Sequence, residues 1–361
     1  MSDVAVEDAV SAYLRRKAVG DPDERGAGTY ASNAESILRR WTAWLESEHG
    51  TTSLFDLDVE HLRSYAATLA DRVDRGEYAA STAHTYFAVV RAFLSWCVRG
   101  GILESNPAAT EAAERALPAA ERSEGQFWTR EQRCTLEEYV RQRALDAEDD
   151  DRRERLGRLR DYAMVAVLAH AGVRAGELFR VPADDRRSGA TWDDVDFYTG
   201  TIRVLGTSQR FEEVLLPAAA RTPLRRYRVV LDPPSNEWPL FPTRHAPSIA
   251  GRVRSVLAER GHDDDEIEAL LDGTTASQLA RERSIPPPAI TTEGARSILK
   301  RLCADADVDV DGGYLKPGGA RRALGERSRR RAATSPGTAL RESYLERSIV
   351  VAEDVPGAGT D

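Results

Sequence analysis

Two turns in the sequence contain arginine, a residue type that binds phosphate. In "AGVRAGEL" a glycine ends an apolar helical stretch, Arg174 follows, and Glu177 comes one turn later. In "KPGGARRALGE" a Pro-Gly-Gly turn between Lys316 and the pair Arg321 and Arg322 opens another helical stretch. The donor fork of arginine matches phosphate oxygens, and the free N–H groups of a helix N-terminus attract anions. Both turns therefore predict sites for an anion.

A tyrosine that follows these arginines is the third candidate. Tyr344 lies in "TALRESYLERS", at a helical position late in the chain. A phenol has a pKa near ~10 and attacks poorly unless cations stabilise the charge that it creates. Each candidate also has a plain structural interpretation. Arg174 and Glu177 can form a salt bridge, the 316–322 stretch can be a solvated basic face, and Tyr344 can be a core aromatic.

The overall charge does not exclude a nucleic-acid partner. The chain of 361 residues has a formal net charge of -9, and its lysines are only Lys17, Lys300 and Lys316. Excess acid with scarce lysine indicates a high-salt cytoplasm, and GC-rich coding is the alternative explanation. Salt screens exposed charges and weakens phosphate-driven DNA affinity. A DNA partner would then be held by close arginine contacts.

Several classes of protein and site are disfavoured by the sequence. No apolar run approaches the roughly 20 residues of a membrane span, and "MSDVAVEDAV" lacks a secretory pattern, so we expect a cytoplasmic protein without a membrane partner. Cys97, Cys134 and Cys303 are too far apart for a metal site and too few for a disulfide framework, which indicates reduced thiols. The histidines are scattered as well, so we expect neither a metal nor another cofactor.

The patterning divides the chain into two domains. Residues 1–108 are predicted to form a bundle of about four helices, because stretches such as "ASNAESILRRWTAWLESEHG" place apolar residues on one helical face. Residues 109–123, rich in Ala, Glu and Pro, are predicted to be a linker that is in part helical. Residues 124–351 form the second domain, and residues 352–361 are expected to be a disordered tail.

The second domain mixes helices with a few strands. "LGRLRDYAMVAVLAHAG" predicts a long helix that ends at Gly172. "ATWDDVDFYTGTIRVLG" and "FEEVLLP" then alternate apolar and polar residues around turns, which predicts two or three strands. Helical patterns return after them. The expected fold class is mainly α with a small antiparallel β-sheet.

The order of these motifs resembles the tyrosine recombinase (phage integrase) family, and within it the haloarchaeal integrase-like branch. The order is Gly-Val-Arg-x-Gly-Glu-Leu, a strand hairpin, Pro-x-Gly-Ala-Arg-Arg and then a tyrosine. The resemblance covers nearly the whole length. It implies that residues 1–108 are a SAM-like core-binding domain and residues 124–351 the catalytic domain.

The resemblance also implies a reaction and its partners. Arg174 and Arg321 would clamp the phosphate of double-stranded DNA, and Tyr344 would attack the phosphorus to form a 3′-phosphotyrosyl link. Glu177, Lys316, Arg322 and Arg210 would be the phosphate-binding or supporting residues. The protein would act as a site-specific recombinase for a mobile element. It would assemble as a tetramer on DNA in the nucleoid.

Three positions depart from the family pattern. The family has a lysine in the hairpin turn, where this chain has Thr207 with Arg210 nearby. It has a histidine at Gly318 and a histidine or tryptophan at Ser335. Because these groups move protons in the family, the departures leave two hypotheses open: a recombinase, or an integrase-derived protein that binds DNA without strand transfer.

A third hypothesis concerns a stretch inside the second domain. "TTASQLARERSIPPPAITTEGARSILKRL" has the rhythm of a helix-turn-helix transcription regulator, with Pro286–Pro288 as its turn. In this interpretation, deletion of residues 262–300 would abolish DNA binding.

Overall fold

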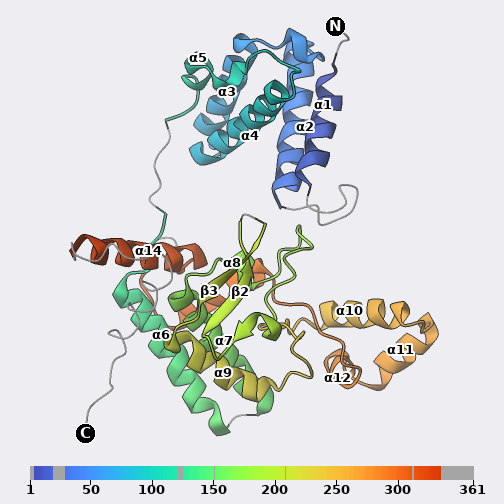
Figure 1. The fold of residues 1–361 in the computed structure, drawn as a ribbon, viewed down its shortest axis with the longest axis vertical. Coiled ribbons are helices and arrows are strands. Elements are labelled where there is room, and N and C mark those ends of the chain that lie inside the picture. Colours follow the sequence, from blue (N-terminus) through green and yellow to red (C-terminus); the bar gives the residue numbers. More distant parts are fainter. Residues whose placement is uncertain are drawn as a thin grey trace. The chain divides into compact units, whose positions relative to one another are not determined.

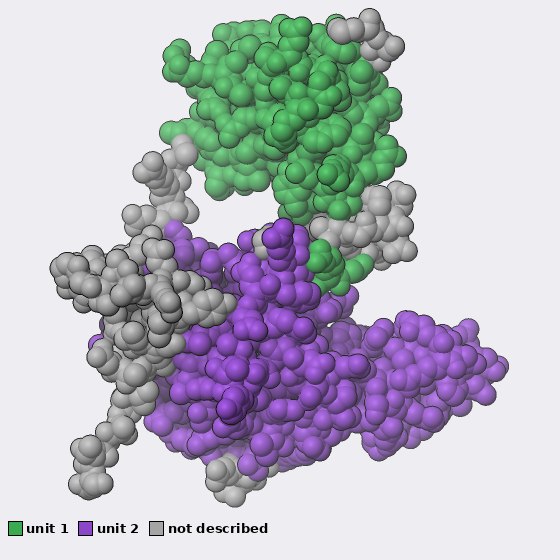
Figure 2. All heavy atoms as spheres, viewed as in Figure 1, with its two compact units in different colours: residues 1–124, 183–186 green, residues 125–182, 187–361 purple. Residues whose placement is uncertain are grey.

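The computed structural model describes residues 4–18, 29–119, 125–149, 151–207, 209–310 and 313–334. The chain divides into two compact units. Unit 1 contains residues 1–124 and 183–186, and unit 2 contains residues 125–182 and 187–361 (Figure 2). The predicted tail, residues 352–361, lies outside the described residues.

Unit 1 is helical in its described part (Figure 1). Its α-helices are α1 (Val6–Lys17), α2 (Thr29–His49), α3 (Val59–Asp74), α4 (Ala80–Arg99) and α5 (Glu111–Glu114), and short 3₁₀ turns are formed by Leu54–Asp56 and Pro107–Ala109. The apolar face predicted from the sequence is buried, with Leu38, Trp41 and Leu45 fully inside the core. Asp58 caps α3 by accepting the N–H of His61 at 3.1 Å.

The first part of the predicted linker folds onto this bundle. Helix α5 packs against α3, and Ala113 is completely buried in the core of unit 1. Thr110 caps the helix by accepting the N–H of Ala113 at 3.3 Å. The Ala-rich composition therefore serves packing here, because small side chains let a short helix approach closely.

Unit 2 is built around one buried helix. Helix α7 (Arg152–Ala171) is enclosed along residues 163–169 and is packed by α6 (Arg130–Leu145), α9 (Ala218–Leu231) and α14 (Pro317–Thr334). A helix that is apolar on every side is stable only when other elements cover it all round. A 3₁₀ turn, Asp146–Asp149, joins α6 to the N-terminal side of α7. The core of unit 2 also contains residues of α13 (Thr292–Asp305).

The strands predicted from the sequence form one small antiparallel sheet in the order β1-β2-β3. They are β1 (Val195–Asp196), which follows a 3₁₀ turn at Trp192–Asp194, β2 (Thr201–Leu205) and β3 (Phe211–Leu215). The register pairs Ile202 with Val195 and Val214, and Leu205 with Phe211. The predicted fold class, mainly α with a small antiparallel sheet, is confirmed.

Three helices of unit 2 form a lobe with a hydrophobic core of its own. They are α10 (Ala246–Glu259), α11 (Asp264–Gly273) and α12 (Ala276–Glu282), which project from the rest of the unit in Figure 1. The chain enters and leaves the lobe side by side: the N–H of Thr243 donates to the carbonyl of Pro288 at 2.8 Å, and that of Ile290 to the carbonyl of Phe241 at 2.8 Å.

The lobe contradicts the helix-turn-helix interpretation. Helix α12 belongs to the core of the lobe, whereas α13 belongs to the main core of unit 2. The segment between them contains the three prolines in succession and pairs at Ala289 with Pro242, so it is too long and extended to be the tight turn of that motif. The helical pattern that suggested the motif belongs to α12 and α13, two helices whose apolar faces pack into different cores.

Among the helices that the structure describes, none combines the length and the apolar character needed to traverse a bilayer.

Candidate active site

Arg174 stands at the start of the short helix α8 (Ala175–Leu178), directly after α7 ends. Gly172 ends α7 in the left-handed conformation, with a φ of 68°, and so turns the chain out of the core. The carboxylate of Glu177 accepts the N–H of Arg174 at 2.7 Å and its Nη1 at 2.5 Å. The side chain of Glu177 is 4% exposed and that of Arg174 is 37% exposed. The salt bridge is present, and the outer face of the guanidinium group remains open to a ligand.

The second arginine turn forms the first turns of α14, which an extended segment braces. Gln126 accepts the N–H of Lys316 at 2.6 Å and donates to the carbonyl of Tyr314 at 2.9 Å. Trp128 Nε1 donates to the carbonyl of Lys316 at 2.8 Å. A Cβ on Gly319 would lie 2.8 Å from Cδ1 of Trp128, so this close approach requires glycine. The brace fixes where α14 begins.

The two neighbouring arginines of α14 differ in their surroundings. Arg322 Nε donates to the carbonyl of Gln126 at 3.0 Å, and its guanidinium carbon lies 6.0 Å from the centre of the Phe127 ring. Arg322 therefore helps to hold the brace. Arg321 is exposed. Its side chain leaves the helix axis at about 100° from that of Arg322, because an α-helix has 3.6 residues per turn. The side chain of Lys316 is exposed as well.

Helix packing brings the elements that carry the two candidate arginines together. The first turns of α14 lie against the end of α7: a Cβ on Gly172 would be 3.5 Å from Cδ1 of Leu324. Arg174 is two residues beyond Gly172, and Arg321 is three residues before Leu324. Guanidinium groups on adjoining elements create a local positive potential that favours a phosphate.

The hairpin turn between β2 and β3 is tied to α8 by Arg187. Its Nη1 donates to the carbonyls of Leu205 at 2.7 Å and Gly176 at 3.2 Å, and its Nη2 donates to the carbonyl of Gly206 at 2.8 Å. Gly176 belongs to α8, whereas Leu205 and Gly206 end β2 and begin the turn. The half-buried guanidinium group thus links the helix of Arg174 to the hairpin.

Thr207 and Arg210 are both exposed in this turn. The N–H of Gly206 donates to the carbonyl of Arg210 at 2.9 Å and closes it. Thr207 has a hydroxyl group at the position where the family that the chain resembles has a lysine. Thr207 follows Gly206, whose carbonyl Arg187 binds, and its hydroxyl is a weaker proton donor than a lysine ammonium group.

Of the other two positions that depart from the family pattern, the structure describes Gly318 but not Ser335. Gly318 is exposed in the first turn of α14, and the nearest atom to a Cβ built there is Nη1 of Arg322 at 3.5 Å, an ordinary contact. The position has room for a side chain. Ser335 and Tyr344 lie outside the described residues, so their places relative to Arg174 and Arg321 stay predictions.

Three residues of this region were missed by the sequence analysis: Gln126, Trp128 and Arg187. A Trp just before the Thr-x-x-Gln capping box of α6 was a readable signal for Trp128, because a large aromatic outside a helical repeat needs a tertiary partner. Nothing in the sequence near Arg187 distinguishes it from the other arginines.

Cys303 lies next to the segment that leads into α14. The thiol of Cys303 is buried, burial raises its pKa, and its sulfur accepts the N–H of Leu315 at 3.3 Å. A neutral, hydrogen-bonded thiol fits a structural role. Within the residues that the structure describes, no three His, Cys, Asp or Glu side chains group as metal ligands would.

Comparison with known proteins gives a structural match. No family model and no curated protein matches the sequence. The crystal structure of XerH site-specific recombinase bound to palindromic difH substrate, a post-cleavage complex, matches with a TM-score of 0.51 and 12% identity, covering 90% of this chain and 86% of that one. A lambda integrase dimer bound to a COC′ core site has 13% identity and a TM-score of 0.47, with 92% and 88% covered. The chain therefore has the fold of the tyrosine recombinases.

Proposed function

We propose that this chain is a site-specific DNA recombinase of the tyrosine type. In the proposal Arg174 and Arg321 bind the non-bridging oxygens of one phosphodiester of double-stranded DNA, and Tyr344 is the nucleophile. The observation that carries the proposal is the packing of the first turns of α14 against the end of α7, which places the two arginine turns on adjoining elements.

The chemistry follows from those residue types. The Tyr344 oxygen forms a bond to phosphorus while the bond from phosphorus to the 5′ oxygen breaks, which leaves a 3′-phosphotyrosyl link and a 5′-hydroxyl. The phenol proton leaves with the attack, and the departing oxygen gains one. Charge builds on the non-bridging oxygens, where bidentate guanidinium donors stabilise it. The 5′-hydroxyl of another strand then attacks the phosphotyrosine, so the bond energy is conserved.

Neighbouring groups fix the backbone that carries Arg174 and Arg321. The buried carboxylate of Glu177 fixes the backbone and one side of the Arg174 guanidinium group, so less side-chain freedom is lost on binding phosphate. The brace of Gln126 and Trp128 fixes the start of α14. Arg322 and Lys316 would add positive charge without touching the reacting atoms.

The second candidate function is a DNA-binding protein without strand transfer. The observation that favours it is the exposed turn with Thr207, together with Gly318 on α14. Proton transfer by a positioned side chain typically contributes about 10²–10⁴-fold to a rate. Arg210 lies in the turn, but the delocalised guanidinium group of arginine stays protonated in proteins and is a poor proton donor.

We infer that the protein serves a mobile element, assembles as a tetramer on two DNA segments and works in the nucleoid of a cell with a salt-rich cytoplasm. The acidic net charge and the scarcity of lysine support the last point. Salt weakens non-specific DNA binding, so close arginine contacts would carry the affinity.

A covalent trapping experiment separates the two functions. The purified chain is incubated with an end-labelled pool of nicked duplexes of randomised sequence, so that a cleaved strand loses its short fragment and cannot be resealed. The proposal expects a protein–DNA adduct that survives SDS and is absent in Tyr344→Phe. The matched control is Tyr198→Phe, because Tyr198 is a 96% exposed tyrosine of the β1–β2 turn and should leave the adduct unchanged.

Each result of the trapping experiment favours one of the two candidate functions. Arg174→Ala and Arg321→Ala should each lower the yield of adduct by at least ~10²-fold, in line with the loss of a transition-state donor. DNA retardation that persists without any adduct would support the second candidate. An adduct that persists in Tyr344→Phe would exclude the assigned nucleophile.

A further inference from the structure

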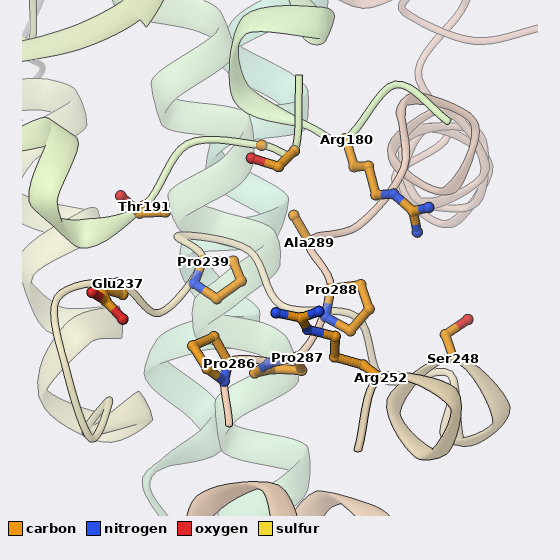
Figure 3. Close-up of a pocket in the computed structure, with 12 residues that line it drawn as sticks. Arg180, Thr191, Glu237, Pro239, Ser248, Arg252, Pro286, Pro287, Pro288 and Ala289 are labelled. Carbon is orange, nitrogen blue, oxygen red and sulfur yellow. The ribbon is translucent and has the colours of Figure 1, made fainter. Parts of the chain in front are cut away.

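A cavity of about 630 Å³ lies in unit 2 where the lobe joins the main body. Its walls come from the loop after α8, from the segment around Pro239, from α10 and from the Pro286–Ala289 segment (Figure 3). This volume is within the range of small-molecule sites, about 300–1,000 Å³. The candidate active site does not use any residue that lines it.

The backbone around the cavity is held in place by tertiary contacts. Gly189 has a φ of 97°, and a Cβ there would lie 2.5 Å from Cβ of Ala289, so the loop and the proline segment touch at this point. Arg180 pairs through its backbone with the same segment: its N–H donates to the carbonyl of Ile290 at 2.9 Å. Three consecutive prolines further restrict the backbone, because each fixes its own φ. The cavity is therefore preformed.

Two arginines line this cavity. Within the described ranges, the side chains of Arg180 and Arg252 make no hydrogen bond or ion pair. Arg254, on the same helix as Arg252, shows the contrast, because its guanidinium group binds both carboxylate oxygens of Glu268 at 2.6 and 3.1 Å. Figure 3 shows Arg180 at one side of the cavity and Arg252 reaching from α10 toward its middle.

Helix α10 adds to the positive potential. Ser248 lies in its first turn and lines the cavity. The helix has no side-chain cap and no acidic residue in that turn. The dipole of the helix places a partial positive charge at this end, although Pro247 has no N–H and the N–H of Ser248 donates to the carbonyl of His245 at 3.0 Å. Together with the two arginines it favours an anion, and the planar guanidinium forks match phosphate oxygens.

The opposite side of the cavity has different chemistry. Glu237 lines it, and Figure 3 shows this carboxylate across the proline segment from Arg180. A carboxylate accepts hydrogen bonds, so it would repel a second phosphate and attract a hydroxyl or amino group. The proline rings between the two ends offer an apolar surface against which a flat ring can lie.

We propose that this cavity binds a small phosphate monoester with a hydrogen-bond donor at its far end, such as a nucleoside monophosphate. The phosphate contacts Arg180 and Arg252, the ring lies on Pro286–Pro288, and the donor reaches Glu237. Such a ligand is an effector and not a cofactor of the proposed strand exchange. It would contact the lobe through Arg252 of α10 and the main body through Arg180 of the loop after α8.

The test is calorimetric titration of the full chain with adenosine monophosphate, with inorganic phosphate and adenosine as partial probes. Saturable binding of the monophosphate is expected, with weaker binding of either part. Arg252→Ala and Arg180→Ala should each raise the Kd about tenfold or more, since each loses charge-assisted hydrogen bonds. The matched control Arg254→Ala removes an arginine of the same helix that is already paired, and it should leave the Kd unchanged.

Further arms keep the result independent of the proposed recombinase activity. Tyr344→Phe should bind the monophosphate with the same Kd, whether or not the chain cleaves DNA. Glu237→Gln should weaken adenosine monophosphate but leave inorganic phosphate unchanged. Absence of monophosphate binding would overturn the proposal. If Arg180→Ala and Arg252→Ala instead weaken retardation of duplex DNA, the site holds a DNA phosphate, and the small-molecule assignment is wrong.

Discussion

Neutralising Asp161 should destabilise unit 2 far more than neutralising an exposed carboxylate with the same kind of partner. Asp161 is on α7, and its side chain is 6% exposed. Its Oδ1 accepts Nε and Nη2 of Arg160 at 3.1 and 2.7 Å, and its Oδ2 accepts Nη2 of Arg301 at 2.7 Å. Arg301 is on α13, so the carboxylate joins the central helix to the segment that leads into α14.

The magnitude follows from these contacts. In Asp161→Asn, the amide N–H₂ must face a guanidinium donor whichever way it turns, and at least one charge-assisted hydrogen bond is lost. The buried charge of Arg160 also loses its compensation. Together these effects should lower the free energy of unfolding by about 2–4 kcal/mol. Other positive charges lie close to Arg160. The pKa of Arg244 is lowered, first by burial and then by the charges of Arg160 and Arg153.

The assay is urea unfolding of the full chain together with hydrogen exchange of peptides from α7 and α13. A change of 2–4 kcal/mol corresponds to roughly 30- to 900-fold faster exchange in the protected core. The control is Glu138→Gln, because Glu138 binds Arg141 through two contacts at 3.1 and 3.0 Å but both side chains are at least half exposed. An exposed pair contributes at most about 1 kcal/mol. Equal effects of the two substitutions would refute the reasoning that burial decides the contribution.

Three further predictions concern the candidate site and the thiols. Gly318→His should raise the adduct yield in the trapping experiment by about tenfold or more, because the position has room and gains a proton-transfer group; no gain would mean that proton transfer is not limiting. Arg187→Met should lower the adduct yield by roughly 10²-fold while the far-UV circular dichroism is unchanged, since the hairpin loses its tie to α8. A thiol reagent at pH 8 should modify exposed Cys134 alone in the native chain and all three cysteines in denaturant. Burial raises the pKa of Cys97 to about 12 and that of Cys303 above its usual value, so these two thiols stay protonated and unreactive. More than one reactive thiol in the native chain would contradict this burial.

Much of the fold was predictable because its signals are local. Helical periodicity placed Leu38, Trp41 and Leu45 in one core, and the alternation in "ATWDDVDFYTGTIRVLG" and "FEEVLLP" indicated the antiparallel strands. Local signals also misled where they lacked context. The rhythm of α12 and α13 suggested a paired motif, although the two helices pack into different cores.

The sequence by itself determined which side chains could do chemistry: a run of arginines at helix starts, a late tyrosine, and Thr207 and Gly318 at positions where the resembling family has proton donors. Tertiary structure decided which of them lie on adjoining elements. The brace between Gln126 and Tyr314 joins residues 188 positions apart, and the Arg301–Asp161 contact spans 140. Contacts of this kind depend on how the helices pack around α7, and no periodicity of a single segment contains that information.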